Sequence, residues 1–229
     1  MISLLRRIIQ KLSRDYGWAP LIKKNFEPDE NYFSEVYRKK LFGKSESASG
    51  PGSGQGATAA IRSHFSKLLQ DFSINSMADI PCGDLFWISK VDLGNVSYSG
   101  FDIVPSLIAT LKSQYPQYKF GQFDAINQIP PKKDLLLCRD LLVHLTTQQA
   151  LQVIENFKKS GSTYLAITTF TTVETNKELV IPKIGVGWRP LNLELVPFDL
   201  GLPLRVINEE STEGLRKYKD KSLALFRLN

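Results

Sequence analysis

Aspartates follow a series of short apolar segments in this 229-residue sequence, where their carboxylates could bind a ligand. Asp79, Asp102 and Asp124 each end such a segment, and Asp140 follows a fourth one. If the segments are parallel strands, the carboxylates gather at the carboxyl edge of a sheet, where open α/β sheets bind ligands. Asp102 stands about twenty residues beyond the first turn, the spacing at which an acidic side chain meets a ribose diol. A carboxylate suits that role because its two oxygens can accept from both hydroxyls.

The turn after the first segment restricts the chemistry of that ligand. It reads Asp-Ile-Pro-Cys-Gly-Asp (residues 79–84) and contains a single glycine, Gly83. A dinucleotide pyrophosphate needs a Gly-x-Gly-x-x-Gly turn whose backbone N–H groups approach the phosphates, so an NAD-dependent oxidoreductase is disfavoured. The acidic turn would repel a pyrophosphate but attract a positive charge. A ligand with a ribose, an adenine and a cationic end fits better, and S-adenosylmethionine (SAM) has these properties.

His144 is the histidine that stands near the end of a predicted strand, and it is the candidate catalytic base together with Asp140. Asp140 precedes it by four residues, so on a helical turn the two side chains share a face. This spacing permits an imidazole that is oriented by a carboxylate and takes a proton from an acceptor. The alternative is that His144 caps or packs beneath the loop after the strand. Asp140 and Asp84 alone are too sparse a set of oxygens to predict a metal site.

A second group of candidate residues lies in Gly-Trp-Arg-Pro-Leu-Asn-Leu (residues 187–193). Trp188 could stack on a sugar or another flat face, Arg189 could bind a phosphate or carboxylate, and Asn192 could hold a hydroxyl. These residue types predict substrate recognition. The alternative is a tryptophan that anchors the loop to the core.

Apolar patterning from about residue 58 onward alternates between strands and helices. Three helices are predicted: one over residues 58–71, one that begins at Pro105, and one that Thr146 or Thr147 caps and that ends at Phe157. Strands are predicted over residues 77–81, 98–103, 118–123, 134–138, 163–170, 204–207 and 222–228. This alternation predicts an α/β fold, a doubly wound, mostly parallel, Rossmann-like sheet of about seven strands with an antiparallel C-terminal strand. An N-terminal helical arm precedes it.

The arm begins with apolar residues at helical spacing, interleaved with arginine and lysine, over residues 1–14. One interpretation is peripheral contact with a membrane surface, and the other is a helix packed on the domain or on a second subunit. Residues 43–56 are rich in glycine and serine but lack the Lys-Ser/Thr pair that a P-loop carries after its last glycine. They form either a flexible linker or an ordered loop that closes over a ligand.

Charge and cysteine content limit the function classes. The net charge is +6. Residues 1–44 hold ten basic and five acidic side chains, or +5, which leaves +1 for the remaining 185 residues and disfavours a nucleic-acid partner. The two cysteines are too few for a disulfide framework and point to the cytoplasm. The apolar runs are shorter than a membrane span of ~20 residues, so no transmembrane segment is expected.

The order of these motifs resembles class I SAM-dependent methyltransferases from about Glu46 onward. Five motifs are similar to those of a little-characterised subgroup related to enzymes of glycan biosynthesis: Ser-Ala-Ser-Gly-Pro-Gly-Ser (47–53), Asp-Ile-Pro-Cys-Gly-Asp-x-x-Trp (79–87), Gly-x-Asp-Ile-Val-Pro (100–105), Cys-Arg-Asp-x-Leu-Val-His-Leu (138–145) and the 187–193 motif. The resemblance implies a lid loop and arm over residues 1–56 and a methyltransferase domain over residues 57–229.

The resemblance also implies the cofactor contacts. The first turn, with Asp79, Pro81, Cys82 and Gly83, would surround the methionine and ribose portions of SAM. The remaining contacts would be Asp102 with the ribose hydroxyls, Ile103 with the adenine face, Asp124 and Ala125 with its amino edge, and Arg139 with the methionine portion. Pro81 departs from the family, in which a glycine is common at this position.

The resulting expectation is methyl transfer from SAM to a small or medium acceptor, most simply a hydroxyl of a sugar, glycan or related metabolite. One alternative is a methyltransferase that acts on RNA or another nucleic acid. Another is a cofactor-binding protein without catalysis, suggested by Pro81 in the first turn. The oligomeric state and the identity of the acceptor stay open.

Overall fold

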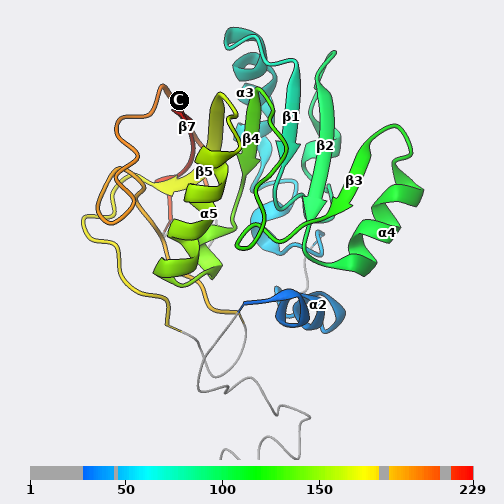
Figure 1. Ribbon diagram of the computed structural model, residues 1–229, viewed down its shortest axis with the longest axis horizontal. Coiled ribbons are helices and arrows are strands. Elements are labelled where there is room, and N and C mark those ends of the chain that lie inside the picture. The colour runs from blue at the N-terminus through cyan, green and yellow to red at the C-terminus, as the bar shows by residue number, and fades with distance from the viewer. Residues whose placement is uncertain (1–27, 44–45, 181–185, 212–217, 229) are drawn as a thin grey trace, which may run out of the picture.

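A seven-stranded sheet with helices on both faces forms the centre of the computed structural model, which describes residues 28–43, 46–180, 186–211 and 218–228 (Figure 1). The strands are β1 (Ser76–Asp79), β2 (Ser97–Asp102), β3 (Lys119–Gln122), β4 (Leu135–Cys138), β5 (Tyr164–Phe170), β6 (Arg205–Asn208) and β7 (Lys221–Arg227). Their order is β3-β2-β1-β4-β5-β7-β6, and β7 runs antiparallel to both of its neighbours. The predicted fold class is confirmed. The predicted amphipathic stretch over residues 1–14 lies outside the described residues.

Strand order reverses at β1, which pairs with β2 on one side and with β4 on the other. Doubly wound sheets bind their ligands at such a switch point, because the crossovers to either side leave in opposite directions and open a crevice. The carboxyl ends of β1, β2 and β4 therefore define where a site belongs in this protein.

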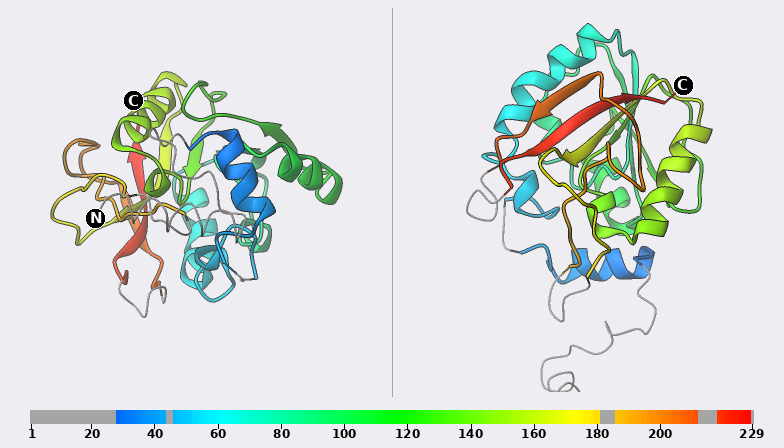
Figure 2. Two further views of the ribbon diagram at one scale, coloured as in Figure 1. Left: turned by 90° about the horizontal axis from the view of Figure 1, so that it is seen from below. Right: turned by 90° about the vertical axis from the view of Figure 1, so that its left-hand side faces the viewer.

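Helices α3 (Ala59–Asp71), α4 (Pro105–Gln114) and α5 (Thr147–Lys159) cover the sheet, with α3 and α5 on opposite faces (Figure 2). β4 shows why both faces must be covered, since all four of its residues are apolar and buried. Leu136 and Cys138 pack with α5, whereas Leu135 and Leu137 pack with α3 and α4. A run of this kind is typical of a central parallel strand.

Helix α2 (Glu30–Arg38) lies across the carboxyl edge of the sheet, below the strand ends in Figure 1. Asp29 caps it, because the Asp29 carboxylate accepts from the backbone N–H of Tyr32 at 2.9 Å. Its buried face packs Phe33 and Val36 against the α5 side of the core. Three short 3-10 turns, η1 (Pro51–Ser53), η2 (Ile88–Lys90) and η3 (Leu142–His144), complete the described helices, none of which is long and apolar enough to span a membrane.

One buried side chain on α5 fixes the loop that follows β3. Asn156 is 5% exposed, and its amide donates to the backbone carbonyls of Ala125 (3.0 Å) and Ile126 (2.8 Å). Both carbonyls belong to a loop without regular structure, so the asparagine supplies the partners that a strand or helix would otherwise provide. The position of this loop thus depends on α5.

We expect Asn156→Ala to lower the free energy of unfolding by about 1–3 kcal/mol, because two inward-facing carbonyls lose their donor. Urea unfolding followed by circular dichroism measures the change. The matched control is Glu155→Ala, which removes only an exposed ion pair with Lys159 at 3.6 Å and should change stability by less than about 0.5 kcal/mol. Equal losses in the two variants would contradict the anchoring role of Asn156.

Candidate active site

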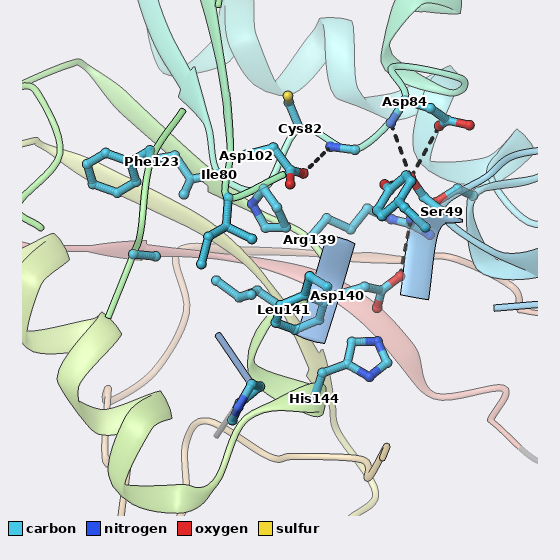
Figure 3. A pocket seen from close by; sticks show the side chains of 18 of the residues that line it. Ser49, Ile80, Cys82, Asp84, Asp102, Phe123, Arg139, Asp140, Leu141 and His144 are labelled. Carbon is cyan, nitrogen blue, oxygen red and sulfur yellow. Dashed lines mark hydrogen bonds and ion pairs between the residues drawn. The ribbon is translucent and has the colours of Figure 1, made fainter. Parts of the chain in front are cut away.

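A cavity of about 960 Å³, counting its open mouth, lies at the switch point (Figure 3). The turns that follow β1, β2, β3 and β4 form its floor, and α2 and residues 46–56 (the serine loop) form its walls. Every parallel strand end that carries an aspartate in the sequence therefore meets at one cavity.

The first turn contributes Pro81, Cys82 and Gly83 to the cavity lining, whereas Asp79 lies beneath the turn. Asp79 is 2% exposed, and it accepts a hydrogen bond from the Tyr98 hydroxyl at 2.8 Å. Burial raises the pKa of Asp79 to about 7 despite that bond. Asp79 therefore supports the turn from below, and its predicted direct contact with a cofactor is not seen in the cavity geometry.

Asp102 ends β2 and faces the cavity with a carboxylate that the backbone holds in place. One carboxylate oxygen accepts from the N–H of Gly83 at 3.2 Å and the other from the N–H of Val104 at 3.1 Å. Burial raises the pKa of Asp102 to about 6, while these backbone N–H groups act in the opposite direction. Each oxygen keeps a second lone pair. The group is thus oriented to accept hydrogen bonds from a diol.

The cavity beyond Asp102 is apolar. Ile103, Phe123, Ala125 and Ile126 line it, which suits a flat heterocycle. Asp124 also lines the cavity, but its carboxylate closes the local turn by accepting from the N–H of Ile126 at 2.9 Å. Asp124 and Ala125 are therefore placed where the sequence predicts them, with Asp124 shaping the loop.

The serine loop is ordered around Asp84, in line with the second of the two interpretations of residues 43–56. The Ser47 hydroxyl lies 2.9 Å from both Asp84 carboxylate oxygens, and the Ala48 N–H donates to one of them at 2.6 Å. Ser49 links this group to α2 through a 2.7 Å contact with the Tyr37 hydroxyl. Figure 3 shows Ser49 and Asp84 on the same side of the cavity.

Gly83 is required where the serine loop meets the first turn. Its φ of +55° is in the left-handed region, and a Cβ would stand 2.4 Å from the Ser49 hydroxyl oxygen. Glycine avoids both the backbone strain and the collision. The single glycine of the first turn thus permits the serine loop to close on it.

A buried ionic cluster of Arg139, Asp140, Glu209 and Lys221 lies at the end of β4. The Arg139 guanidinium donates to both Glu209 oxygens, at 2.9 and 2.6 Å, and to the carbonyl of Gly52 in the serine loop at 2.7 Å. Lys221 on β7 lies 2.7 Å from an Asp140 oxygen and 3.5 Å from Glu209. Arg139 lines the cavity as predicted, but its donors hold protein groups. The sequence analysis missed Glu209 and Lys221.

Asp140 has a strained backbone and a carboxylate oxygen without a partner. Its φ is +60°, and its N–H donates to the Thr168 hydroxyl at 2.9 Å. Although burial favours the neutral acid, the positive charges of Lys221 and Arg139 hold the pKa of Asp140 far below its usual range. Its Oδ1 is buried and makes no hydrogen bond within the described residues. A ligand that donates a hydrogen bond could satisfy this oxygen.

His144 lines the cavity, but Asp140 does not orient it as predicted. The imidazole Nδ1 lies 2.7 Å from the carbonyl oxygen of Gly187, which can only accept, so Nδ1 carries the proton. The reason is local geometry, since η3 is a single 3-10 turn and Asp140 pairs with Lys221 instead. Burial lowers the pKa of His144, which leaves a neutral ring with its lone pair on Nε2.

The three residues predicted to recognise a substrate, Trp188, Arg189 and Asn192, do not line the cavity. Trp188 packs against Phe170 and Tyr218, with ring centroids 5.5 and 4.6 Å apart. Arg189 donates to the carbonyl of Leu145 and to the hydroxyl of Thr147. The amide of Asn192 donates to the carbonyl of Val173 at 3.1 Å. The polar groups of Arg189 and Asn192 thus bind the protein chain itself.

Other aromatic residues that the sequence analysis did not select line the cavity. Phe33, Tyr37 and Phe42 come from α2 and the segment after it, and the Phe42 ring lies 5.5 Å from the His144 ring. The apolar face of α2 signals burial, but nothing in its spacing shows that the helix lies across the carboxyl edge of the sheet. Within the described ranges, no three histidine, cysteine or acidic side chains gather in a way that could hold a metal ion.

Comparisons with known proteins place the fold. No family model and no curated protein matches the sequence. TnmH superposes with a TM-score of 0.60 at 12% identity, covering 100% of this chain and 68% of TnmH. Magnesium protoporphyrin IX methyltransferase (ChlM) from Synechocystis PCC 6803, solved with bound S-adenosylhomocysteine (SAH), superposes with a TM-score of 0.58 at 13% identity, covering 86% of this chain and 97% of ChlM.

Human N-acetylserotonin methyltransferase, solved in complex with SAM, gives a TM-score of 0.55 at 11% identity over 86% of this chain. The chain spans about half of that protein, 54% of its length. A S-adenosylmethionine-dependent methyltransferase from Clostridium acetobutylicum gives a TM-score of 0.56 at 10% identity, covering 87% of this chain and 98% of that one. The chain has the Rossmann-like fold of SAM-dependent methyltransferases.

Proposed function

We propose that this protein is a SAM-dependent methyltransferase that acts on a hydroxyl of a small or medium acceptor. The observation that carries the proposal is the Asp102 carboxylate, which the N–H groups of Gly83 and Val104 orient at the switch point. Asp102 lies between an acidic region of the cavity and an apolar region. A nucleoside that carries a positive charge and no phosphate suits this arrangement, with its charge in the acidic region and its base in the apolar one. The fold shared with methyltransferases supports the same ligand.

The residues of the cavity fit SAM. Asp102 would accept from the ribose hydroxyls, and Ile103 and Phe123 would pack on the adenine. Asp140 would receive the methionine ammonium, because its unpaired Oδ1 needs a donor. Asp84 adds a further negative charge at this end of the cavity. When bound, SAM would supply a methyl group on a positively charged sulfur. A nucleophile can displace SAH from this methyl carbon without the help of a metal.

His144 is the candidate base for a hydroxyl acceptor. The acceptor oxygen must lose its proton as its bond to the methyl carbon forms. A neutral imidazole whose Nδ1 is occupied can take that proton on Nε2. The lowered pKa of His144 keeps the ring neutral at neutral pH, so that Nε2 is free to accept a proton.

The acceptor that we propose first is a sugar, a glycan or a related metabolite, on the strength of the motif resemblance. Phe42 beside His144 offers a surface for the apolar face of a sugar ring. A hydroxylated aromatic ring is the second candidate, because Phe33, Phe42 and Leu145 make this end of the cavity apolar. We further propose a cytoplasmic location, where the two free cysteines would stay reduced.

The testing experiment is calorimetric titration of the full chain with SAM, SAH and, as a control, NAD. We expect micromolar binding of SAM and SAH and no binding of NAD. Asp102→Ala should weaken SAH binding about tenfold to a hundredfold, since a hydrogen bond to a charged group contributes roughly 1.5–3 kcal/mol. Asp92→Ala, at an exposed position outside this cavity, is the matched control. Absence of binding by the wild type would refute the cofactor assignment.

SAH affinity should fall as the pH is lowered from 7.5 to 5. The pKa of Asp102 is about 6 in the free protein, so the carboxylate that accepts from the ribose is present above pH 6 and lost below it. The expected loss at pH 5 is up to about tenfold. Asp102→Asn should remove this part of the pH dependence, while any contribution of Asp79 persists in both proteins. An unchanged pH profile in Asp102→Asn would contradict the ribose contact.

His144→Gln should leave SAH binding within about twofold and lower kcat at least about a hundredfold, because glutamine keeps a donor for Gly187 but cannot take the proton. SAH production with sugars, sugar nucleotides, hydroxylated aromatic compounds and RNA identifies the acceptor and measures kcat. The control is His64→Gln on the exposed face of α3. Full turnover in His144→Gln would show that another group removes the proton.

A further inference from the structure

The segment from Gly187 to Arg189 lies alongside η3 and bonds to its residues in sequence. The N–H of Arg189 donates to the carbonyl of Val143 at 3.0 Å, and the carbonyl of Gly187 accepts from Nδ1 of His144. Two residues of one segment thus hold two consecutive residues of the 3-10 turn. A single 3-10 turn fixes little by itself, so its geometry depends on this neighbour.

The Arg189 side chain extends the same contact beyond His144. Its guanidinium donates to the carbonyl of Leu145 and lies 3.3 Å from the Thr147 hydroxyl, at the first turn of α5. Arg189 is 5% exposed, so this charge is buried against the Leu145 carbonyl and the Thr147 hydroxyl. Glu178, 4.0 Å away, is its acidic neighbour and also accepts from the N–H of Thr147 at 3.0 Å. Arg189 therefore contacts the chain on both sides of His144.

The segment is itself fixed to the end of β5. Trp188 packs edge-on against Phe170, and the N–H of Phe170 donates to the carbonyl of Leu191 at 2.8 Å. A Cβ on Gly187 would stand 3.3 Å from Leu179, so the chain passes closely there. The Gly187 carbonyl that accepts from His144 therefore belongs to a segment that is fixed to β5.

We propose that Gly187–Arg189 is the positioning segment for His144, which sets its tautomer and its place in the cavity, with Arg189 as the positioning residue. The inference deepens the proposed function, since it rests on His144 as the base. The segment is the motif that the sequence predicted for substrate recognition. The segment instead contacts the proposed base, because its backbone groups bond to residues of η3 and none of its own three residues lines the cavity.

Ring-nitrogen NMR tests the proposal without any acceptor. The chain has two histidines, so a His64→Gln background leaves His144 as the single imidazole. At pH 7 we expect a neutral ring protonated on Nδ1. The Asp140 and Lys221 charges also act on the ring, in opposite directions, and stay unchanged in this background. A proton on Nε2 in this protein would overturn the proposal, whatever the variants do.

Arg189→Met should shift the His144 ring toward a mixture of tautomers and bring its pKa closer to 6.5, the ordinary value. It should also lower kcat about tenfold while the SAH Kd stays within about twofold. Arg189→Lys keeps one donor for the Leu145 carbonyl and should recover part of the loss. The matched control is Arg205→Met, whose arginine is exposed and pairs with Asp71 at 3.2 Å.

Loss of kcat in Arg189→Met with an unchanged tautomer and pKa of His144 would overturn the positioning role. The proposed function fails separately, through absence of SAM binding or of methyl transfer in the wild type. In that case the NMR result still decides whether the segment positions the imidazole. The two failures are therefore distinguishable.

Discussion

The ionic cluster at the end of β4 joins four parts of the protein beside the cavity. Arg139 follows β4, Glu209 follows β6, Lys221 begins β7, and the Gly52 carbonyl brings in the serine loop. Two positive and two negative side chains balance within it. Buried charges are costly unless each is paired and hydrogen-bonded, so removal of one member leaves the others uncompensated. The serine loop is therefore joined to the sheet through Arg139, a charged residue that also lines the cavity.

The division of the cavity into an acidic and an apolar region follows from this arrangement. Asp140 keeps its charge because Lys221 and Arg139 are already in place, and the low pKa makes its unpaired oxygen an acceptor at any physiological pH. Among the described residues, Asp102 by contrast accepts from the backbone N–H groups of Gly83 and Val104, and burial raises its pKa to about 6. Two aspartates at the ends of β2 and β4, on either side of β1, thus differ in basicity because of their partners.

The sequence was sufficient for the sheet and for the strand ends that form the floor of the cavity. Strands show a period of two or a continuous apolar run, and both features are local, as Leu135–Cys138 demonstrates. Asp102 could be found because it ends a strand at the switch point. Glu209 and Lys221 could not, because their position beside Arg139 depends on the register of β7 between β5 and β6. The pairing register of strands that are distant in the sequence cannot be predicted from the residues of one strand alone.

The 187–193 motif shows a different limit. Tryptophan, arginine and asparagine can bind a sugar or can hold a loop, and the choice depends on which groups lie nearby. One terminal nitrogen of the Arg189 guanidinium donates to the Leu145 carbonyl, and the Asn192 amide donates to the Val173 carbonyl, so both side chains bind the protein itself. The same ambiguity applies to His144, whose orienting partner is a carbonyl distant in sequence. Residue type indicates what a side chain can do, and tertiary structure selects among those roles.

The place of β7 in the sheet has a consequence for the growing polypeptide on the ribosome. β7 is the last of the seven strands to be synthesised, yet it inserts between β5 and β6. Until Lys221 emerges, Asp140 lacks its closest cation and Glu209 lacks the neighbouring strand that holds its backbone. In a nascent chain that ends before β7, the lining residue Asp140 is therefore without the ion pair that it makes with Lys221. The charge of Asp140 is thus paired with Lys221 only after the first six strands of the sheet have been made.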